Sequence, residues 1–176
     1  MNNELLMITA SGEDRQGLFE QFAGRIADSG CNIEESSVSV IGGQFTLIAR
    51  VAGPWHALSK LEGQIEALAA QPDLVVRHQR IANGPRTAAI PYSVEVITMD
   101  KPAIPRRLAT FFVRNGINIE ALHISTYPAP HTGNPLTSIV MTVGIHGKIH
   151  IPTLRGDFLD LCDDLNLDAT LEPIRG

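Results

Sequence analysis

The chain has 176 residues, of which 44% are hydrophobic and 19% are charged, so it is expected to fold and not to stay disordered. Its net charge of -5 and its pI of about 5.6 argue against direct binding of nucleic acid. No apolar run approaches the ~18 residues of a membrane span, and no basic segment opens the chain. We therefore expect a cytoplasmic protein that does not contact a membrane.

The first half of the chain predicts the order strand, helix, strand, strand, helix, strand. Apolar residues recur at helical spacing from Leu18 to Ile26, with Asp14 as a candidate N-terminal cap and Gly30 as a candidate stop. The pair Gly42-Gly43 favours a hairpin turn. In chain order, the sequence predicts a strand over 5–10, a helix from Leu18, strands over 32–41 and 44–51, a helix over 54–70 and a strand over 74–81.

The second half of the chain predicts the same order. Here the tight hairpin turn is replaced by a longer segment over 128–135. The composition of residues 84–89 is typical of a linker, so we expect domains over 1–83 and 90–176. The predicted elements are a strand over 92–99, a helix from Ile104, strands over 117–127 and 136–145, a helix from Pro152 and a strand over 168–174.

Two motifs recur at one spacing, which indicates an internal repeat. The segment 14–18, Asp-Arg-Gln-Gly-Leu, is echoed by Asp-Lys-Pro-Ala-Ile at 100–104. The segment 30–34, Gly-Cys-Asn-Ile-Glu, is echoed by Gly-Ile-Asn-Ile-Glu at 116–120. Both pairs are offset by 86 residues, since 100 − 14 and 116 − 30 are both 86. Two motifs held at one offset are hard to explain by chance.

Both copies share an irregularity in the first hairpin strand. The apolar phase shifts after Ile33 and again after Ile119, and a strand of period two can shift phase only through a bulge or twist. The shared irregularity and the element order predict an α+β fold, with two ferredoxin-like βαββαβ domains in tandem.

The repeated motif has groups suited to a small zwitterion. A helix N-terminus favours an anion such as a carboxylate, and Gly17 would let a ligand approach the backbone closely. Asn32 offers both a donor and an acceptor, while Glu34 or Asp14 could face an ammonium group. The same residues also fit a structural interpretation, in which Asp14 caps the helix, Gly17 eases packing and Asn32 bonds a turn.

The motif pair resembles the ACT domain, a regulatory module whose signature is close to Asp-Arg-Pro-Gly-Ile/Leu followed by Gly-x-Asn-Ile. In that family the effector amino acid commonly lies between neighbouring modules, one giving the loop and the other the Asn-bearing strand. Gln16 replaces the usual Pro, and Ala103 replaces the Gly, which could narrow the second loop. The resemblance implies ligand-binding residues Asp14, Arg15, Gln16, Gly17, Leu18, Asn32 and Ile33, and in the second copy Lys101, Pro102, Ala103, Ile104, Asn118 and Ile119.

A chain of two such modules without a catalytic partner resembles the glycine cleavage system transcriptional repressor family. This implies a non-enzymatic regulator that senses a small amino acid, with glycine favoured, and acts through a DNA-binding transcriptional activator. We also expect a homo-oligomer. The alternatives are a detached regulatory subunit of an amino-acid-metabolising enzyme, or a chaperone for an enzyme or transporter.

Other constellations in the sequence predict no catalytic, metal or cofactor site. His146 and His150 are four residues apart, but Gly147 between them and the nearby Pro152 argue against a helical zinc pair. The sequence contains no Walker loop, no GxGxxG and no G-x-S-x-G turn. The two cysteines form no CxxC pair and are expected to be free thiols.

Overall fold

The computed structural model describes residues 4–82, 84, 89–99, 102–130 and 132–174. The chain divides into two compact units, Met1–Pro85 and Arg86–Gly176. The first contains β1 (Glu4–Glu13), α1 (Leu18–Asp28), β2 (Asn32–Ile41), β3 (Gln44–Gly53), α2 (Trp55–Ala69) and β4 (Leu74–Ile81). The second contains β5 (Ala89–Met99), α3 (Ile104–Arg114), β6 (Asn118–Pro128), β7 (Pro135–His146), α4 (Ile151–Leu165) and β8 (Asp168–Pro173).

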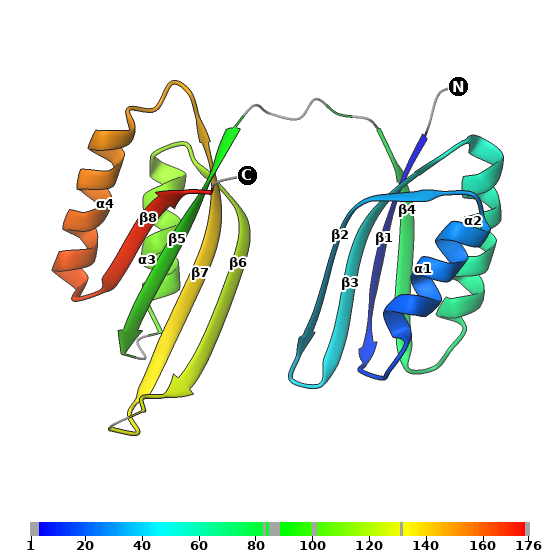
Figure 1. Cartoon of the computed structure of the whole chain (residues 1–176), viewed down its shortest axis with the longest axis horizontal. Coiled ribbons are helices and arrows are strands. Elements are labelled where there is room, and N and C mark those ends of the chain that lie inside the picture. Colours follow the sequence, from blue (N-terminus) through cyan, green and yellow to red (C-terminus); the bar gives the residue numbers. More distant parts are fainter. Residues whose placement is uncertain (1–3, 83, 85–88, 100–101, 131, 175–176) are drawn as a thin grey trace. The chain divides into compact units, whose positions relative to one another are not determined.

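Each unit is a four-stranded antiparallel sheet with both of its helices on one face (Figure 1). The strand orders are β2-β3-β1-β4 and β6-β7-β5-β8, so the Asn-bearing strands β2 and β6 lie at sheet edges. The fold is therefore α+β, with two ferredoxin-like βαββαβ domains in tandem, and this prediction is confirmed. Strand β5 begins within the predicted linker, because Ala89 already pairs with His146.

The phase shift predicted for both edge strands is a β-bulge. The pairing of β2 with β3 shifts between Ile33 and Glu35, and that of β6 with β7 shifts between Ile119 and Ala121. The extra residue of each bulge is therefore a glutamate, Glu34 or Glu120. A bulge returns the later apolar residues of each strand to the helix-covered face, which explains the sequence pattern.

Glycines end the first helix of each copy. Gly30 has φ 80° and Gly116 has φ 68°, a region that suits glycine because it has no Cβ. The residue after each glycine closes the helix, since Cys31 N donates to Ile26 O at 3.1 Å and Ile117 N donates to Phe112 O at 2.9 Å. The stop predicted at Gly30 is confirmed.

The cap predicted at Asp14 is wrong. The N-cap position of α1 is Gly17, with φ 87° and no side-chain cap. Asp14 lies a full turn earlier in the chain, and its backbone N–H donates instead to Gly43 O in the β2–β3 turn at 2.9 Å. The first turn of α1 is thus left without a side-chain acceptor.

Each unit has its own hydrophobic core between sheet and helices. In the first, Phe22 stacks on Phe45 with ring centroids 6.4 Å apart. In the second, Phe112 and Phe158 are fully buried with centroids 5.7 Å apart, and Phe111 packs against both. Burial of each such side chain contributes roughly 1.5–3 kcal/mol, so each unit buries enough apolar side chains to stabilise a core of its own.

Candidate functional site

The loop before α1 presents an uncapped helix N-terminus. Gly17 adopts a left-handed conformation, and an added Cβ there would meet no protein atom within 4 Å. Helix geometry leaves the first N–H groups without intrahelical partners, and the helix dipole places partial positive charge beside them. Leu18 N already donates to Arg15 O at 3.4 Å, so the N–H groups of Phe19 and Glu20 are the ones that this helix start offers to a carboxylate.

A cavity of about 410 Å³ lies beside this loop, between it and the α2–β4 connection. Arg15 donates through Nη2 to Gln71 Oε1 and so ties the loop to that connection. The cavity combines carboxylates with one guanidinium, which suits a ligand that carries both an ammonium and a carboxylate group. Its lining residues are Glu13, Asp14, Arg15, Leu18, Gln71, Pro72, Asp73 and Leu74.

Asn32 and Ile33 lie far from this loop within the same domain. Asn32 pairs with Ala52 of β3, and Ala52 pairs on its other side with Leu5, near the start of β1. The loop before α1 follows Glu13, at the opposite end of β1. The eight residue steps between Leu5 and Glu13 span about 27 Å of strand. One domain therefore does not bring the two halves of the predicted site together. A site that uses both needs a second module.

The second copy of the loop has a different conformation. Ala103 is the N-cap of α3 with φ −79° and ψ −17°, an ordinary right-handed helical conformation where Gly17 is left-handed. Pro102 lies in the turn before it and Ile104 is buried as the first helical residue. Asp100 and Lys101 of the repeated motif lie outside the described residues. The departure at Ala103 therefore changes the backbone as well as adding a methyl group.

The second loop also lacks the wall that closes the first cavity. Four residues connect α2 to β4, over 70–73, whereas two connect α4 to β8, over 166–167. Gln71, Pro72 and Asp73 therefore have no equivalents beside Ala103. On the edge strand, Asn118 pairs with Gly144, and Ile119 packs against the second core as Ile33 packs against the first.

Glu34, considered as a partner for an ammonium group, is held by a cation of its own domain. Its Oε2 lies 3.1 Å from Arg50 Nη2, and Glu35 Oε2 lies 3.7 Å from Arg50 Nε. The bulge thus directs Glu34 toward β3. Asp14 remains the better placed of the two carboxylates considered, because it lines the cavity beside the helix N-terminus.

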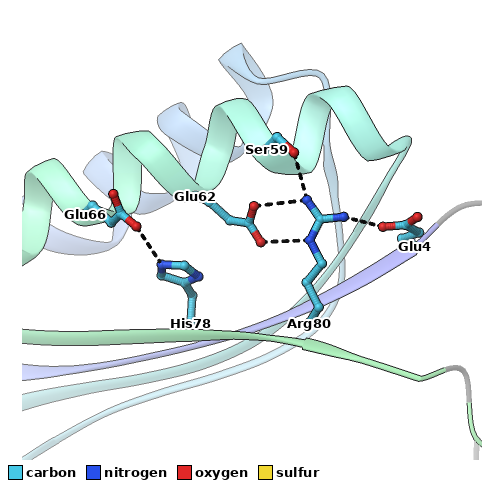
Figure 2. A network of polar contacts seen from close by, with 6 residues as sticks. All are labelled: Glu4, Ser59, Glu62, Glu66, His78 and Arg80. Carbon is cyan, nitrogen blue, oxygen red and sulfur yellow. Dashed lines mark hydrogen bonds and ion pairs between the residues drawn. The ribbon is translucent and has the colours of Figure 1, made fainter.

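A polar cluster that the sequence did not indicate joins α2 to the neighbouring strands β4 and β1 of the first sheet (Figure 2). Arg80 donates to both carboxylate oxygens of Glu62, at 2.8 and 3.0 Å, to Ser59 Oγ at 2.9 Å, and to Glu4. The hydrogen bond from Arg80 lowers the pKa of Glu62. Because the guanidinium is saturated by its own domain, we interpret this cluster as structural.

Sequence reasoning also missed a surface hollow in the second domain. A cavity of about 640 Å³ lies along α3 and reaches Leu161 of α4. The only sequence signal was the run of basic residues over 101–114, which taken alone is also typical of a solvated helix face.

Within the described residues, no group of three or more His, Cys, Asp or Glu side chains could hold a metal ion. The helices in that part of the chain are too short or too polar to cross a membrane. Cys31 and Cys162 are free thiols, and burial raises the pKa of both.

Residues 4–79, nearly the whole first domain, match the family model of the ACT domain. The chain therefore has an ACT-domain match in its first domain and repeats the same βαββαβ fold in its second. It is similar to the glycine cleavage system transcriptional repressors of Escherichia coli (strain K12) and Shigella flexneri. Each is 29% identical over 171 residues, covering 96% of this chain and 90% of the relative.

Two solved structures share the whole fold. A crystal structure that carries the name glycine cleavage system transcriptional repressor covers 100% of both chains, with a TM-score of 0.75 and 24% identity. The crystal structure of an unknown protein from Galdieria sulphuraria covers 99% of this chain and 100% of its own, with a TM-score of 0.78 and 21% identity. At these identities the likeness concerns the fold alone.

Proposed function

We propose that this chain is a non-enzymatic regulator that binds a small amino acid, with glycine favoured, at the loop before α1. The observation that carries the proposal is the uncapped N-terminus of α1, which opens beside a cavity lined by both carboxylates and a guanidinium. The ligand carboxylate would accept from the helix N–H groups, and its ammonium would face Asp14 or Asp73. Glycine fits because it presents only these two groups.

The complete site uses an Asn-bearing strand start from a neighbouring module. Strands β2 and β6 lie at sheet edges, and edge strands favour pairing with another strand. We therefore include a homo-oligomer in the proposal, with Asn32 or Asn118 of one module reaching the loop of another. The second loop has neither the left-handed glycine nor the cavity wall of the first, because Ala103 is right-handed and the α4–β8 connection is short. The loop at Gly17 is therefore the stronger candidate.

The regulatory output is control of glycine cleavage genes through contact with a DNA-binding activator. Similarity to two glycine cleavage system transcriptional repressors over 96% of the chain supports this part. The acidic pI of about 5.6 supports action through a protein and not by direct contact with DNA. A tagged chain used as bait in cell extract, with and without glycine, should retain a transcriptional activator. Retention of a metabolic enzyme instead would contradict this output.

Ligand binding is tested by thermal unfolding across the common amino acids. A ligand at a hundredfold excess over its Kd stabilises the folded state by about 2.7 kcal/mol, which for a domain of this size is a Tm shift of roughly 11–22 °C. Glycine should give such a shift. A midpoint that moves for none of the amino acids would refute the sensing proposal.

The site itself is tested by Gly17→Ala with Gly30→Ala as the matched control. Both glycines have positive φ, 87° and 80°, and an added Cβ at either meets no protein atom within 4 Å. The two variants thus carry similar backbone strain at opposite ends of α1. Gly17→Ala should abolish the glycine-induced shift and Gly30→Ala should keep it. Equal responses of the two variants would place the ligand elsewhere.

A further inference from the structure

The cavity between α3 and α4 has a cationic wall and an apolar floor. Arg106, Arg107 and Arg114 line it from α3, and Phe111 and Leu161 form its apolar surface. The three arginines are exposed, and none of them forms an ion pair with another described residue. Three uncompensated guanidinium groups around one hollow create a local positive potential on a chain whose net charge is -5.

The first domain shows that the fold does not require this hollow. There, Ser29 Oγ donates to Gln64 Oε1 at 3.0 Å, and Lys60 Nζ donates to Asp28 O at 2.6 Å, so two hydrogen bonds bridge α1 and α2. The counterparts in the second domain follow from the repeat. Ser29 corresponds to Asn115 at the offset of 86 residues. The buried residues Ala57, Leu61 and Ile65 align with Leu154, Phe158 and Cys162 at an offset of 97.

The offset of 97 places Leu161 where Gln64 lies. A leucine cannot accept a hydrogen bond, and the Asn115 amide instead donates to Phe111 O of its own helix at 2.9 Å. The bridge between the helices is thus lost at that level, and the space beside Phe111 and Leu161 stays open as the cavity.

The arginines are also specific to the second domain. The residues at the positions of Arg106, Arg107 and Arg114 in the first domain are Glu20, Gln21 and Asp28, each 86 residues earlier. Two of the three positions therefore reverse their charge between copies that share one fold. Charged side chains of either sign keep a helix face soluble, so solubility does not explain why these positions are positive on α3. The basic wall therefore needs a separate explanation.

The opposite helix limits the size of an occupant. Asp157, Asp160 and Asp164 are exposed on α4, and Asp157 occupies the position of Lys60, which reaches across to α1 in the first domain. An acidic helix or a nucleic acid laid along the groove would meet these carboxylates as well as the arginines. A small anion held against α3 avoids most of that repulsion.

We propose that the groove between α3 and α4 binds a small organic anion, a carboxylate or a phosphate monoester with a compact apolar body. The planar guanidinium forks of Arg107 and Arg114 suit bidentate recognition of either anionic group. The apolar body packs against Phe111 and Leu161. The volume of about 640 Å³ lies within the range of small-molecule sites. This site is separate from the loop at Gly17 and does not depend on it.

The test is a titration of the full-length ¹⁵N-labelled chain at constant ionic strength with phenylacetate, phenyl phosphate or inorganic phosphate. Amide shifts should change over residues 103–115 and around Leu161 for at least one of the two aromatic anions, which also tells carboxylate from phosphate. Inorganic phosphate should bind at least about tenfold more weakly than the better aromatic anion, because it lacks the apolar body. Residues 55–62 of α2 serve as the internal control, since they lie at the end of that helix away from the loop at Gly17 and their fold is the same without the hollow.

Two sets of variants separate a site from general attraction of anions. Replacing Arg107 or Arg114 by Gln should weaken binding about 10- to 100-fold, the usual effect of losing a charge-assisted hydrogen bond. Arg77→Gln, at an exposed position of β4, should leave binding unchanged. The double variant Asn115→Ser with Leu161→Gln restores the residue pair that bridges α1 and α2, and it should close the groove and abolish binding in a folded protein.

Three results would overturn the proposal. The first is an absence of shift changes with both aromatic anions at 10-fold molar excess over about 1 mM protein, a range that detects the weakest specific sites. The second is a set of shift changes spread equally over both domains. The third is binding that survives both the arginine and the groove-closing variants.

Discussion

Replacing Arg80 by methionine should destabilise the first domain and leave the second unchanged. The guanidinium of Arg80 connects β4 to Ser59 and Glu62 on α2 and to Glu4 on β1 (Figure 2). It also lies 5.7 Å from the ring centroid of Trp55. Methionine keeps most of the side-chain stem, so the change removes the charge and its hydrogen bonds with little loss of packing.

The expected size follows from the exposure of the partners. Arg80 and Glu62 have side-chain exposures of 31% and 23%, so their bidentate pair is partly protected from water, while Glu4 at 44% contributes less. A partly exposed bidentate pair with one further hydrogen bond contributes about 1.5–3 kcal/mol. For a domain of this size each kcal/mol corresponds to about 4–8 °C in Tm.

Urea unfolding followed by tryptophan fluorescence measures this loss of stability in the first domain alone. Trp55 is the single tryptophan and lies in the first domain, so its signal reports that unit. The control is Arg77→Met on the same strand, because Arg77 forms no ion pair with any other described residue. An unchanged midpoint for Arg80→Met, or an equal loss in the control, would refute the reasoning.

Three shorter predictions follow from the same structure. The hydrogen bond from Arg80 lowers the pKa of Glu62 below its ordinary 4.5, so this pair stabilises the fold at neutral pH. That contribution is lost as the pH falls through the pKa of Glu62 in the folded state. In an acid titration, the free energy of unfolding of Arg80→Met should therefore fall less steeply than that of the unmodified protein. Gly12→Ala should cost about 1–3 kcal/mol in urea unfolding, because its Cβ would lie 2.2 Å from Asp73 O. Burial raises the pKa of Cys162 to about 11, so a thiol reagent at pH 8 should label it at least about tenfold faster in urea than in buffer.

The element order was predictable because local signals and the repeat agreed. Gly30 and Gly116 end helices where the periodic apolar residues stop, and the phase slip after Ile33 and Ile119 marks real bulges. The cap at Asp14 was not predictable, since its residue type suits a cap but the loop reaches a further turn to Gly17 before the helix begins. Residue preference cannot give the path of a loop.

The candidate site was only half visible in the sequence. The motif located the loop at Gly17, but the wall over 71–73 comes from a connection far away in the chain that carries no motif of its own. The cavity beside Leu161 could not be predicted from the sequence, because it arises where the second copy lacks the interhelical hydrogen bond of the first. It emerges only when the contacts of Ser29 with Gln64 are compared with the second copy.

The two bulges fix how the edge strands can be extended. Beyond the bulge, β2 offers an uninterrupted ladder over residues 35–41, and β6 offers one over 121–127, before Pro128. A strand added to either edge would lose its regular hydrogen bonding at the bulge, so the bulge limits how far it can slide. Because the bulges lie at equivalent positions of the two copies, both edges favour the same alignment. A partner strand selected by one edge would therefore also fit the other.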